Sequence, residues 1–497
     1  MRTMIILAGG EATRLGPLTA QMSKALVSIK QRPIIAHHVR QAVLANCDEI
    51  IVVTSPASDL QVRRVLERMN CPLPFTTVPQ PEPHGPVHAL MVGLEMLVRS
   101  MKYDSGEDEV IVIAADTYLS EPGSLAVAAA EGLFIGMAHT HDMVRSWTWH
   151  EPEQLLWTDS PIPYPEDVFI GVFMSRLQWL CSTVEATLAQ EGVDATMGPF
   201  LRFLDFQTAR HRFTDWHDVG DLPALAAARR ATFTSRDKHK LSLNDRGVVT
   251  KIGASMGESI KAKEMSDLVL GPRWLGYDED IERLQLEYCD LPSLAELFLY
   301  WPGRPDTWQH VLSVVMARLE RDLWTGINVE RRQALKAAQD MYIDKPRRRL
   351  IAHGGYPVPE PLIDYIAQEV VHEVHPSRIH GDLNFGNILY SLGTDVFRLI
   401  DPRGDWGGFK RWGDLRYEYA KLRFSYRGLT AITHDLDVSR AAEARAMDEL
   451  LEDRGVNLKH IAAIEATMYL SSIPLHDKSE REPMYQAALR CTEEAIS

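Results

Sequence analysis

Short runs of apolar residues alternate with segments of helical spacing along the first part of the chain. The runs are rich in β-branched residues and lie at residues 4–8, 49–54, 109–116 and 167–175. Strands that are apolar at consecutive positions are buried on both faces, which is typical of a parallel sheet covered by helices. Ile34 to Ala45 has the spacing of an intervening helix, and Asp221 stands near the start of a closing helix. The pattern predicts an α/β domain with a mostly parallel sheet and helices on both faces.

The pattern changes after about residue 232, where we expect a domain boundary. Residues 234–253 read as two strands around an Asn-Asp-Arg-Gly turn, which predicts a β-hairpin rather than another strand-helix unit. From about residue 294 the spacing is mostly helical. The length suits two or three domains, each with its own core. The predicted parts are a first domain at 1–232 and a second at 233–497, with a strand-rich lobe at about 233–293 and a helical lobe at about 294–497.

Composition narrows the class of protein. The 497 residues include 53 Lys and Arg against 68 Asp and Glu, a formal net charge of -15. An acidic balance argues against a protein that wraps nucleic acid or lies on an anionic membrane. The 5 cysteines are scattered without a CxxC pair, and no segment approaches the roughly 18 apolar residues of a membrane span. We expect a soluble cytoplasmic protein with small-molecule partners, and homo-oligomerisation stays open.

One basic cluster, Lys345-Pro346-Arg347-Arg348-Arg349, stands out from this acidic background. Such a run is typical of a solvated helix start, and contact with an anion is the alternative. The sequence favours the solvated helix.

A glycine loop, LAGGEATRL at residues 7–15, follows the first strand directly. Parallel sheets present ligands at the carboxyl ends of their strands. Gly9 and Gly10 allow the backbone to approach a nucleotide closely, and peptide N–H groups in such a loop can cradle phosphates. Arg14 and Lys24 supply positive charge for a triphosphate. The loop is therefore a candidate nucleotide site.

The longer pattern LAGGEATRLGPLTAQMSKALVSI resembles the opening motif of the sugar-1-phosphate and phosphocholine nucleotidyltransferases, roughly LAGGxGTRLxPLT followed by a PKxLxPI-like segment. Ala12 stands where most members have glycine, and Ser23 where most have proline. The resemblance implies a Rossmann-like domain and a Mg²⁺-dependent reaction in which a phosphate monoester attacks the α-phosphate of an NTP and pyrophosphate leaves. The implied residues are Arg14 and Lys24 for catalysis and Leu7, Ala8, Gly9 and Gly10 for nucleotide binding.

Two carboxylates fit the metal-binding part of this resemblance. Asp116 ends the strand at 109–116, and Asp218 lies in WHDVG, which matches the family's W-x-D-x-G segment. Carboxylates hold the cation that bridges crowded phosphates, although an aspartate that stands alone at the end of a strand or helix is more often a cap. With the opening motif present, we assign both aspartates to metal binding.

Gln80 and Gly85 lie in a stretch that resembles the loop by which this family contacts the nucleobase. His84 and His88 have the i, i+4 spacing of a metal site, but no third ligand is suggested nearby, so we prefer the nucleotide loop. The family's usual Glu-Lys-Pro segment, whose lysine holds the sugar phosphate, is not found. The corresponding region is residues 155–173, which leaves the acceptor phosphate without an obvious partner.

A second candidate site begins at HGDLNFGNILY, residues 380–390, and an aspartate follows at the end of an apolar segment, VFRLID. Phosphoryl transfer needs one carboxylate to accept the hydroxyl proton, and an amide and a further carboxylate to hold Mg²⁺ on the ATP phosphates. The arrangement resembles the aminoglycoside phosphotransferase and choline kinase superfamily. The resemblance implies a bilobal protein-kinase-like domain in which Asp382 is the base, Asn387 and Asp401 bind metal, and His380 orients the loop.

The strand-rich lobe can be fitted to the same resemblance. Lys251 resembles the strand lysine that pairs with the α- and β-phosphates, and a helix glutamate should hold it. We prefer Glu264 to Glu258, because its distance leaves room for a loop and a turn. The segment at 284–297 resembles the hinge between lobes, whose backbone at about Glu287 to Cys289 would contact adenine.

Together the two resemblances predict a bifunctional transferase. A kinase makes a phosphate monoester from a sugar or polyol with ATP, and a nucleotidyltransferase consumes it with CTP, GTP, UTP or dTTP, giving an NDP-activated donor and pyrophosphate. By analogy, the DPRG segment at 401–404 indicates surface glycans such as capsule polysaccharide. Arg403 in this segment could bind a phosphate, although we favour an ion pair with Asp405 or Asp414.

Three alternatives remain open. A choline or amino-alcohol kinase with a cytidylyltransferase would make CDP-choline-like products and should have an aromatic box. The candidate rings, which are more often core residues, are Trp406, Trp412, Tyr417 and Tyr419. One domain could instead be a non-catalytic nucleotide-binding regulator, but no base or metal ligand is lost. Antibiotic phosphorylation would leave the first domain without a purpose.

Overall fold

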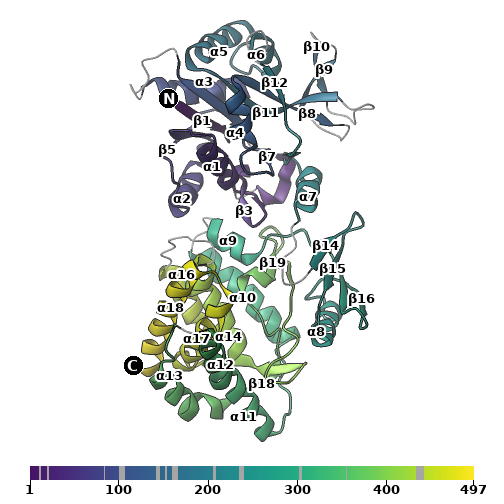
Figure 1. Cartoon of the computed structure of the whole chain (residues 1–497), viewed down its shortest axis with the longest axis vertical. Helices are drawn as coiled ribbons and strands as arrows, with labels where there is room; N and C mark the ends of the chain where they lie inside the picture. Colours follow the sequence, from purple (N-terminus) through teal and green to yellow (C-terminus); the bar gives the residue numbers. More distant parts are fainter. Residues whose placement is uncertain are drawn as a thin grey trace. The chain divides into compact units, whose positions relative to one another are not determined.

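The chain forms two compact units, Met1–Thr232 and Phe233–Ser497 (Figure 1). The division falls next to the residue where the sequence pattern changes. The computed structural model describes the whole chain except residues 11–12, 20–21, 83, 100–106, 141–145, 151–153, 159–165, 205–208, 234–239, 301–304, 354 and 433–440. In the described part of the chain, no helix is both long and apolar enough to cross a membrane.

The first unit is built on one large sheet. In the described residues its strand order is β10-β9-β11-β6-β1-β4-β5, with β8 paired to β11 and β12 paired to β8. Strands β6, β1, β4 and β5 are parallel, as their apolar runs predict, and β11 extends the sheet through antiparallel pairs. The strands are β1 (Arg2–Leu7), β4 (Glu49–Thr54), β5 (Phe75–Pro79), β6 (Glu109–Ala114), β8 (Phe134–Thr140), β9 (Ser146–His150), β10 (Gln154–Thr158), β11 (Glu166–Arg176) and β12 (Ala209–Arg212).

Helices cover both faces of the parallel part. The chain passes from β1 through α1 (Ile34–Leu44) to β4 and through α2 (Asp59–Arg68) to β5, and then returns through α3 (Pro86–Arg99) to β6. Because such crossovers are right-handed, the reversal places α3 on the opposite face from α1 and α2. Met4 and Ile5, which point to opposite faces of β1, are accordingly both fully buried. The predicted α/β fold is confirmed.

A small antiparallel pair joins distant parts of this unit. Strand β7 (Thr117–Leu119) directly follows β6 and pairs with β13 (Trp216–Asp218). The closing helix α7 (Leu222–Ala231) begins at Asp221, whose carboxylate accepts a hydrogen bond from the Ala224 amide at 3.0 Å, as predicted. The remaining elements are η1 (Thr13–Leu18), η2 (Lys24–Leu26), β2 (Ser28–Ile29), β3 (Arg32–Pro33), α4 (Ser124–Glu131), α5 (Leu177–Glu191) and α6 (Met197–Leu204).

The second unit starts with an antiparallel sheet of order β14-β15-β17-β16. The expected hairpin is β14 (Lys240–Leu243) and β15 (Val248–Ile252), and Gly247 in its turn has a φ of +71°, which only glycine adopts without strain. Helix α8 (Met256–Asp267) packs on this sheet. The other two strands are β16 (Trp274–Asp278) and β17 (Arg283–Glu287).

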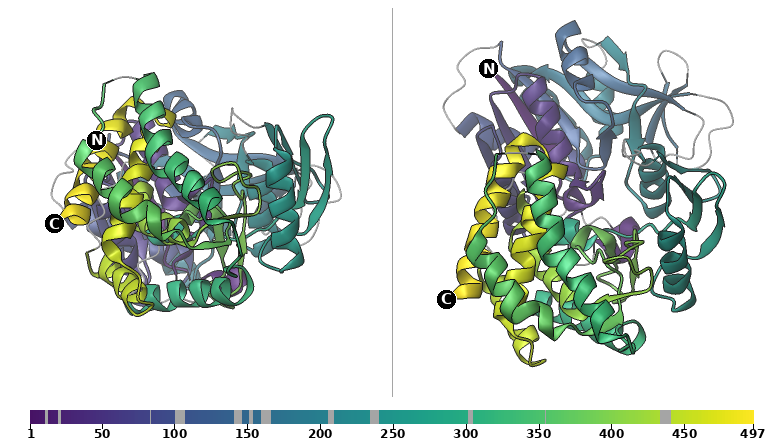
Figure 2. Two further views of the ribbon diagram at one scale, coloured as in Figure 1. Left: turned by 90° about the horizontal axis from the view of Figure 1, so that it is seen from below. Right: turned by 60° about the horizontal axis from the view of Figure 1, so that its bottom comes forward.

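The rest of the second unit is mostly helical, as expected from residue 294 onward. Figure 2 shows its helices, coloured green to yellow, packed side by side, with the teal sheet and α8 at one edge. Two short strand pairs, β18 with β21 and β19 with β20, carry the loops between these helices. The elements are α9 (Leu294–Tyr300), α10 (Pro305–Asp322), α11 (Arg331–Gln339), η3 (Asp340–Asp344), α12 (Lys345–His353), α13 (Glu360–Tyr365), η4 (Ile366–Val370), η5 (Val371–Glu373), β18 (Pro376–Arg378), η6 (Phe385–Asn387), β19 (Ile388–Tyr390), β20 (Phe397–Leu399), β21 (Trp412–Asp414), α14 (Leu415–Phe424), η7 (Ser425–Leu429), α15 (Thr430–Ile432), α16 (Ala441–Glu452), α17 (Leu458–Ser472), η8 (Ile473–Leu475) and α18 (Lys478–Ile496).

Candidate active sites

The first candidate site lies where the order of the parallel strands reverses. Strand β1 leads to β4 on one side, while β6 lies on its other side, so the carboxyl ends of β1 and β6 flank a topological switch point. The Ala8 amide donates to Val53 O at 2.7 Å, and the Ala115 amide donates to Leu7 O at 3.1 Å. These bonds fix the start of the glycine loop against both neighbouring strands.

The glycine loop is tightly packed around Gly9 and has open space beside Gly10. A side chain on Gly9 would meet Gln80 Oε1 at 2.8 Å and the Thr54 carbonyl oxygen at 3.4 Å. A side chain on Gly10 would have only Lys24 Nζ within 4 Å, at 3.9 Å. Gly9 therefore serves the packing of the loop, and Gly10 faces the lysine. Ala12 lies outside the described residues.

Lys24 pairs with the first predicted metal ligand. Its Nζ lies 3.0 Å from Asp116 Oδ2, and both side chains are mostly buried. Lys24 begins the short turn η2, in which the Ala25 amide donates to the hydroxyl of Ser23 at 3.4 Å. Serine can thus take the position where proline is usual in the family, because it supplies a cap at the same place.

Asp218 and Arg14 reach the same place from other segments. The Val219 amide donates to Asp116 O at 3.0 Å, which joins the end of β13 to the end of β6. A side chain on Gly220 would meet Asp218 Oδ1 at 3.1 Å, Arg14 at 3.4 Å and Asp116 Oδ2 at 3.5 Å. The structure therefore brings Arg14, Lys24, Asp116 and Asp218 together, as the resemblance implied.

The pKa values of the two carboxylates shift in opposite directions. Burial, and then the nearby Asp116 charge, raise the pKa of Asp218 to about 6. Burial also opposes ionisation of Asp116, but the ion pair with Lys24 outweighs it and lowers the pKa of Asp116. Two crowded carboxylates of which one resists ionisation form a site that a divalent cation would stabilise, and oxygen ligands suit Mg²⁺. The residues therefore fit the implied metal.

Gln80 and Gly85 lie beside this site, in a loop held by side chains. Gln80 Nε2 donates to His84 O at 3.1 Å and lies 3.0 Å from His88 Nδ1. The backbone amide of Gln80 donates to Thr54 O at 2.8 Å. A side chain on Gly85 would meet Ala195 O at 2.5 Å, so glycine is required there by the packing of backbone on backbone. The histidine pair is thereby explained as part of the loop. The region expected to hold the acceptor phosphate includes residues 159–165, which are outside the described part.

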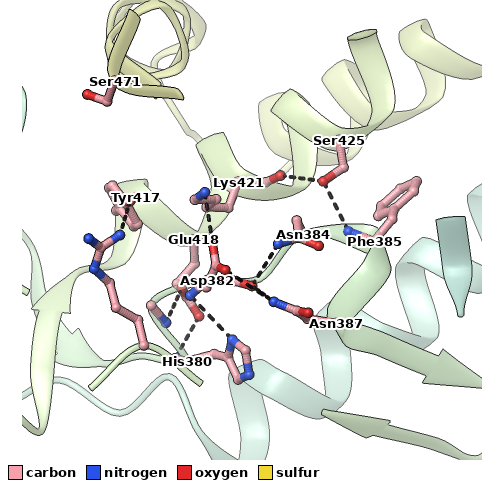
Figure 3. Close-up of polar contacts among 12 residues, drawn as sticks. His380, Asp382, Asn384, Phe385, Asn387, Tyr417, Glu418, Lys421, Ser425 and Ser471 are labelled. Carbon is pink, nitrogen blue, oxygen red and sulfur yellow. Dashed lines mark hydrogen bonds and ion pairs between the residues drawn. The ribbon is translucent and has the colours of Figure 1, made fainter. Parts of the chain in front are cut away.

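The second candidate site is built on the loop before η6. Asp382 Oδ1 forms an ion pair with Lys421 Nζ at 2.9 Å, and Asp382 Oδ2 accepts from Asn387 Nδ2 at 3.2 Å. Figure 3 shows Asp382 between Lys421 on one side and Asn384 and Asn387 on the other. Burial opposes ionisation of Asp382, but Lys421 outweighs it and lowers its pKa to about 2. Asp382 is thus an ionised acceptor for a proton.

Two residues that sequence reasoning missed hold this loop. Glu418 of α14 is fully buried and accepts from the His380 amide at 2.9 Å and the Gly381 amide at 2.8 Å. Lys421, one turn later on the same helix, provides the partner of Asp382. Their i, i+3 spacing in α14 is the only sequence signal, and it does not indicate which loop they contact.

His380 acts as a neutral spacer beneath the loop. Burial lowers its pKa to about 4. Its Nε2 lies 3.0 Å from Ile400 O, and its Nδ1 accepts from the Asp382 amide at 3.3 Å. The neutral tautomer with the proton on Nε2 satisfies both contacts, so His380 links the loop at Asp382 to the segment that carries Asp401. This agrees with the orienting role that the resemblance implied.

Lys251 pairs with Glu258, and the preference for Glu264 is wrong. Lys251 Nζ lies 2.6 Å from Glu258 Oε1 and 2.6 Å from Asp401 Oδ1. Glu258 is fixed by the capping box of α8, in which the Ser255 amide donates to Glu258 Oε2 at 2.7 Å. Glu264 lies six residues further on, so its side chain points about 240° around the helix, and it contacts Arg378 at 3.4 Å.

Asn387 and Asp401 are joined by the backbone. The Ile400 amide donates to Asn387 O at 3.0 Å, which aligns the two segments. Because Asn387 turns its amide nitrogen to Asp382, its amide oxygen points away from that carboxylate. Asp401 has a φ of +55°, in the left-handed region that aspartate adopts more readily than most residues. An amide oxygen and a carboxylate fit Mg²⁺ here as well.

The predicted adenine-binding segment follows β17. The Glu287 amide donates to Arg273 O at 2.9 Å and the Tyr288 amide to Gly247 O at 2.8 Å. The burial of the Cys289 side chain raises the pKa of its thiol, so this cysteine is not a reactive group. Backbone hydrogen bonds thus fix Glu287 and Tyr288, and Cys289 comes next in the chain. Contact between adenine and the backbone at Glu287 to Cys289 stays a prediction.

The candidate aromatic box belongs to the core. Trp406 is fully buried against Trp412 and Tyr417, and Tyr419 packs on Trp324. These rings are therefore engaged with one another, as the more common interpretation expects.

Arg403 makes neither of the ion pairs that the sequence favoured. Its Nε donates to the backbone oxygen of Asp405 at 2.8 Å, and its guanidinium donates to the Tyr417 hydroxyl at 3.3 Å. The Asp414 carboxylate is instead taken by Arg416 and the Tyr342 hydroxyl. Among the described residues, Arg403 therefore forms no ion pair with a carboxylate, although Asp382 and Asp405 are near enough to raise its pKa.

Comparison with known proteins bears on the first unit. Residues 3–133 match the family described as nucleotidyl transferase. This part of the chain is similar to the nucleotidyl transferases. The nucleotidyl transferase region, residues 3–133, contains the glycine loop, Lys24 and Asp116 but ends before Asp218.

The chain has sequence relatives that are named for sugar 1-phosphates. The glucose-1-phosphate thymidylyltransferase of Mycolicibacterium smegmatis is 31% identical over 120 residues, which are 24% of this chain and 39% of that protein. The mannose-1-phosphate guanylyltransferase catalytic subunit beta of Xenopus tropicalis is 31% identical over 97 residues, which are 19% of this chain and 27% of that protein. The matches thus span less than half of these relatives.

A solved structure of UDP-glucose pyrophosphorylase complexed with UDP-glucose is 17% identical and has a TM-score of 0.37, over 46% of this chain and 98% of that one.

Proposed function

We propose that the chain is a bifunctional transferase. The second unit phosphorylates a small hydroxylated substrate, a sugar or polyol, with ATP. The first unit couples the resulting phosphate monoester to an NTP, giving an NDP-activated donor of the kind used in glycan synthesis. The observation that carries the proposal is a recurring arrangement, in which a lysine pairs with an aspartate that follows a strand: Lys24 with Asp116 at 3.0 Å, and Lys251 with Asp401 at 2.6 Å.

The first unit supports nucleotidyl transfer through its own side chains. In the proposed step an oxygen of the phosphate monoester attacks the α-phosphate, a new P–O bond forms, and the bond to pyrophosphate breaks. Arg14 and Lys24 neutralise the phosphates, since Lys24 lies near Gly10, which follows β1, and Arg14 lies near Gly220, which follows β13. Asp116 and Asp218 would hold Mg²⁺, which supplies charge stabilisation for the leaving pyrophosphate. The similarity of the nucleotidyl transferase region to enzymes named for sugar 1-phosphates supports a sugar-type acceptor.

The second unit supports phosphoryl transfer through Asp382. The ionised carboxylate accepts the proton of the substrate hydroxyl, the hydroxyl oxygen attacks the γ-phosphate, and ADP leaves. Lys251, held by Glu258, provides a positive charge for the ATP phosphates. Asn387 and Asp401 would hold Mg²⁺, which neutralises charge on those phosphates. Lys421 holds Asp382 in place, and its charge keeps that base ionised.

Product analysis tests the whole proposal. The protein is incubated with Mg²⁺, ATP, one of CTP, GTP, UTP or dTTP, and pooled sugars and polyols, and the products are identified by mass spectrometry. We expect an NDP-linked mass that requires both ATP and one particular NTP. A phosphorylated acceptor without any NDP-linked product would contradict the coupled reaction.

Lys251→Met is expected to weaken ATP use specifically. Loss of a charged hydrogen-bond donor to the phosphates should raise the KM for ATP by roughly tenfold or more. The matched control is Lys263→Met, on the exposed face of α8, where the lysine pairs with Asp267 at 2.9 Å and lies 5.9 Å from the centre of the Trp274 ring. Steady-state kinetics and Mg²⁺-AMP-PNP affinity measure both variants. An equal effect of the two substitutions would contradict the role of Lys251.

A further inference from the structure

The basic cluster at the start of α12 divides into two faces. Arg347 pairs with Glu360, and Arg348 pairs with Asp340 at 2.8 Å, both on the surface. Lys345 and Arg349, one turn apart, share a face of the helix and are partly buried, whereas Arg348 beside them is exposed. The outer two arginines are the solvated helix start that the sequence favoured, and the inner pair has a different environment.

The inner pair joins two other cations near Asp382. Lys345 lies within the electrostatic reach of Arg349, Arg403 and Lys421, and Asp382 is the one carboxylate among the groups that act on it. The Arg349 guanidinium donates to Ser471 O at 2.6 Å, and Lys345 Nζ has the weak acceptor Met341 Sδ at 4.0 Å. Among the described residues, Arg349, Arg403 and Lys345 have no carboxylate within ion-pair distance, and Asp382 is already paired with Lys421.

This arrangement is costly in the isolated protein. Burial, and then repulsion by Arg403, Arg349 and Lys421, lower the pKa of Lys345 to about 6. Burial and Arg403 also lower the pKa of Arg349. Basic groups buried without a counter-charge resist protonation, and groups with strongly shifted pKa values are concentrated at functional sites. A bound anion would favour the protonated form of Lys345.

The two oxygens of Asp382 separate this cluster from the proposed nucleotide side. Oδ2 faces Asn387, and Asp401 and Lys251 lie beyond it. Oδ1 faces Lys421, which is one of the cations that act on Lys345. A substrate hydroxyl placed at Oδ1 would therefore bring the rest of its molecule toward the cations rather than toward the metal ligands.

We propose that Lys345, Arg349 and Arg403 form an anion-binding subsite for the phosphate acceptor of the second unit, so that the acceptor is a hydroxylated compound carrying a carboxylate or phosphate. This inference rests on the proposed kinase function and names its substrate class. It excludes choline and ethanolamine, because a cationic head group would be repelled by the same residues. Arg403 suits the role because a guanidinium binds carboxylate or phosphate bidentately.

Matched acceptors test the charge requirement. Glycerol, D-glycerate and glycerol 1-phosphate share three carbons, and D-glucitol, D-gluconate and glucose 6-phosphate share six; choline and ethanolamine complete the panel. Phosphorylation by ATP is followed by ADP release and mass spectrometry. We expect phosphoryl transfer to the anionic compounds and none to choline. Comparison of the carboxylates with the phosphates shows which of the two groups the subsite binds. Preferred transfer to a neutral or cationic member would overturn the inference.

Variants of α12 locate the subsite. Lys345→Met and Arg349→Met should each raise the acceptor KM by roughly tenfold or more, with the KM for ATP unchanged. Arg348→Met removes an exposed arginine of the same helix that is already paired with Asp340 at 2.8 Å; it is the matched control and should behave as wild type. A rise in the KM for ATP instead would assign the cations to the γ-phosphate and overturn the inference, as would equal behaviour of inner and outer variants.

Binding of inorganic phosphate provides a readout that does not need the true acceptor. With saturating Mg²⁺-AMP-PNP, calorimetry should detect phosphate binding to wild type and Arg348→Met, and roughly tenfold weaker binding to the inner variants. Equal binding to all would overturn the subsite. If wild type bound no Mg²⁺-AMP-PNP, the kinase function itself would fail; nucleotide binding with transfer only to neutral acceptors would refute the anion subsite alone.

Stability separates this role from a structural one. Lys345 has a pKa of about 6 in the fold and an ordinary value of 10.5, so between these pH values the unfolded chain holds a proton that the folded chain lacks. The stability cost therefore grows as pH falls from about 10 toward 6. Lys345→Met should raise the melting midpoint at pH 7 by roughly 2 to 4 °C while weakening acceptor binding. A lower midpoint would indicate a structural lysine and contradict the inference.

Discussion

Asp382→Asn is expected to abolish ATP-dependent phosphorylation, with kcat falling by about 10² to 10⁴-fold, the usual contribution of a general base. The amide cannot accept the hydroxyl proton, although it keeps the shape of the carboxylate. Its neighbours are also arranged for an anion, because Lys421 lies 2.9 Å from Asp382 Oδ1 and Asn387 donates to Oδ2. The measurement is ADP release dependent on an acceptor, with the KM for ATP recorded alongside.

Two comparisons make that result specific. Asp267→Asn removes a carboxylate that is paired with Lys263 on the exposed face of α8, and it should leave phosphorylation unchanged. The Asp382 variant should still release pyrophosphate when a phosphorylated acceptor and the correct NTP are supplied. Retention of ATP-dependent phosphorylation in the Asp382 variant would refute the assignment of the base.

Asp116→Asn is expected to have the reverse effect. Pyrophosphate release should fall by about 10³-fold or more, which at 1.36 kcal/mol per factor of ten is about 4 kcal/mol of transition-state stabilisation. Asp116 is the partner of Lys24 and lies beside Asp218 at Gly220, so its loss removes a metal ligand and leaves Asp218 as the remaining carboxylate. Phosphorylation by ATP should persist.

The control for this variant is Asp167→Asn, because Asp167 is also an ion-paired aspartate of the first unit, with Arg212 at 2.8 Å. Circular dichroism and the melting midpoint confirm that each variant is folded. If either Asp116→Asn or Asp382→Asn silenced both reactions in a folded protein, the proposal of two separate sites would be refuted.

The parallel strands were predictable because burial on both faces leaves a local signature. β1, β4 and β6 each contain at least four consecutive apolar residues, and the glycine loop follows the first of them directly. The antiparallel strands β9 and β10 contain mixed residues over five positions each, so their pairing depends on contacts that no local pattern encodes. Features that depend on neighbouring residues in the sequence could therefore be predicted, and the pairing of these strands could not.

The lysine partner in the second unit shows the same limit within one helix. Glu258 and Glu264 are both possible by spacing, and only the point where α8 begins decides which one faces β15. The capping box of Ser255 with Glu258 marks that point in the sequence, so this signal could have given the correct residue. By contrast, the contact of Lys421 with Asp382 joins residues 39 apart through the packing of α14, and the sequence carries no sign of it.

The lysine pairs of the two sites have a consequence for how nucleotide and metal bind. Lys24 and Lys251 each occupy the carboxylate that the proposal gives to Mg²⁺. Phosphates that draw the lysine away would expose a partly buried anion, and a cation arriving alone would compete with the lysine. When nucleotide and metal bind together, the lysine pairs with the phosphates and the metal pairs with the carboxylate, so no charge is left without a partner. Each ligand should therefore strengthen the binding of the other by the same factor, a heterotropic coupling that is present in both units.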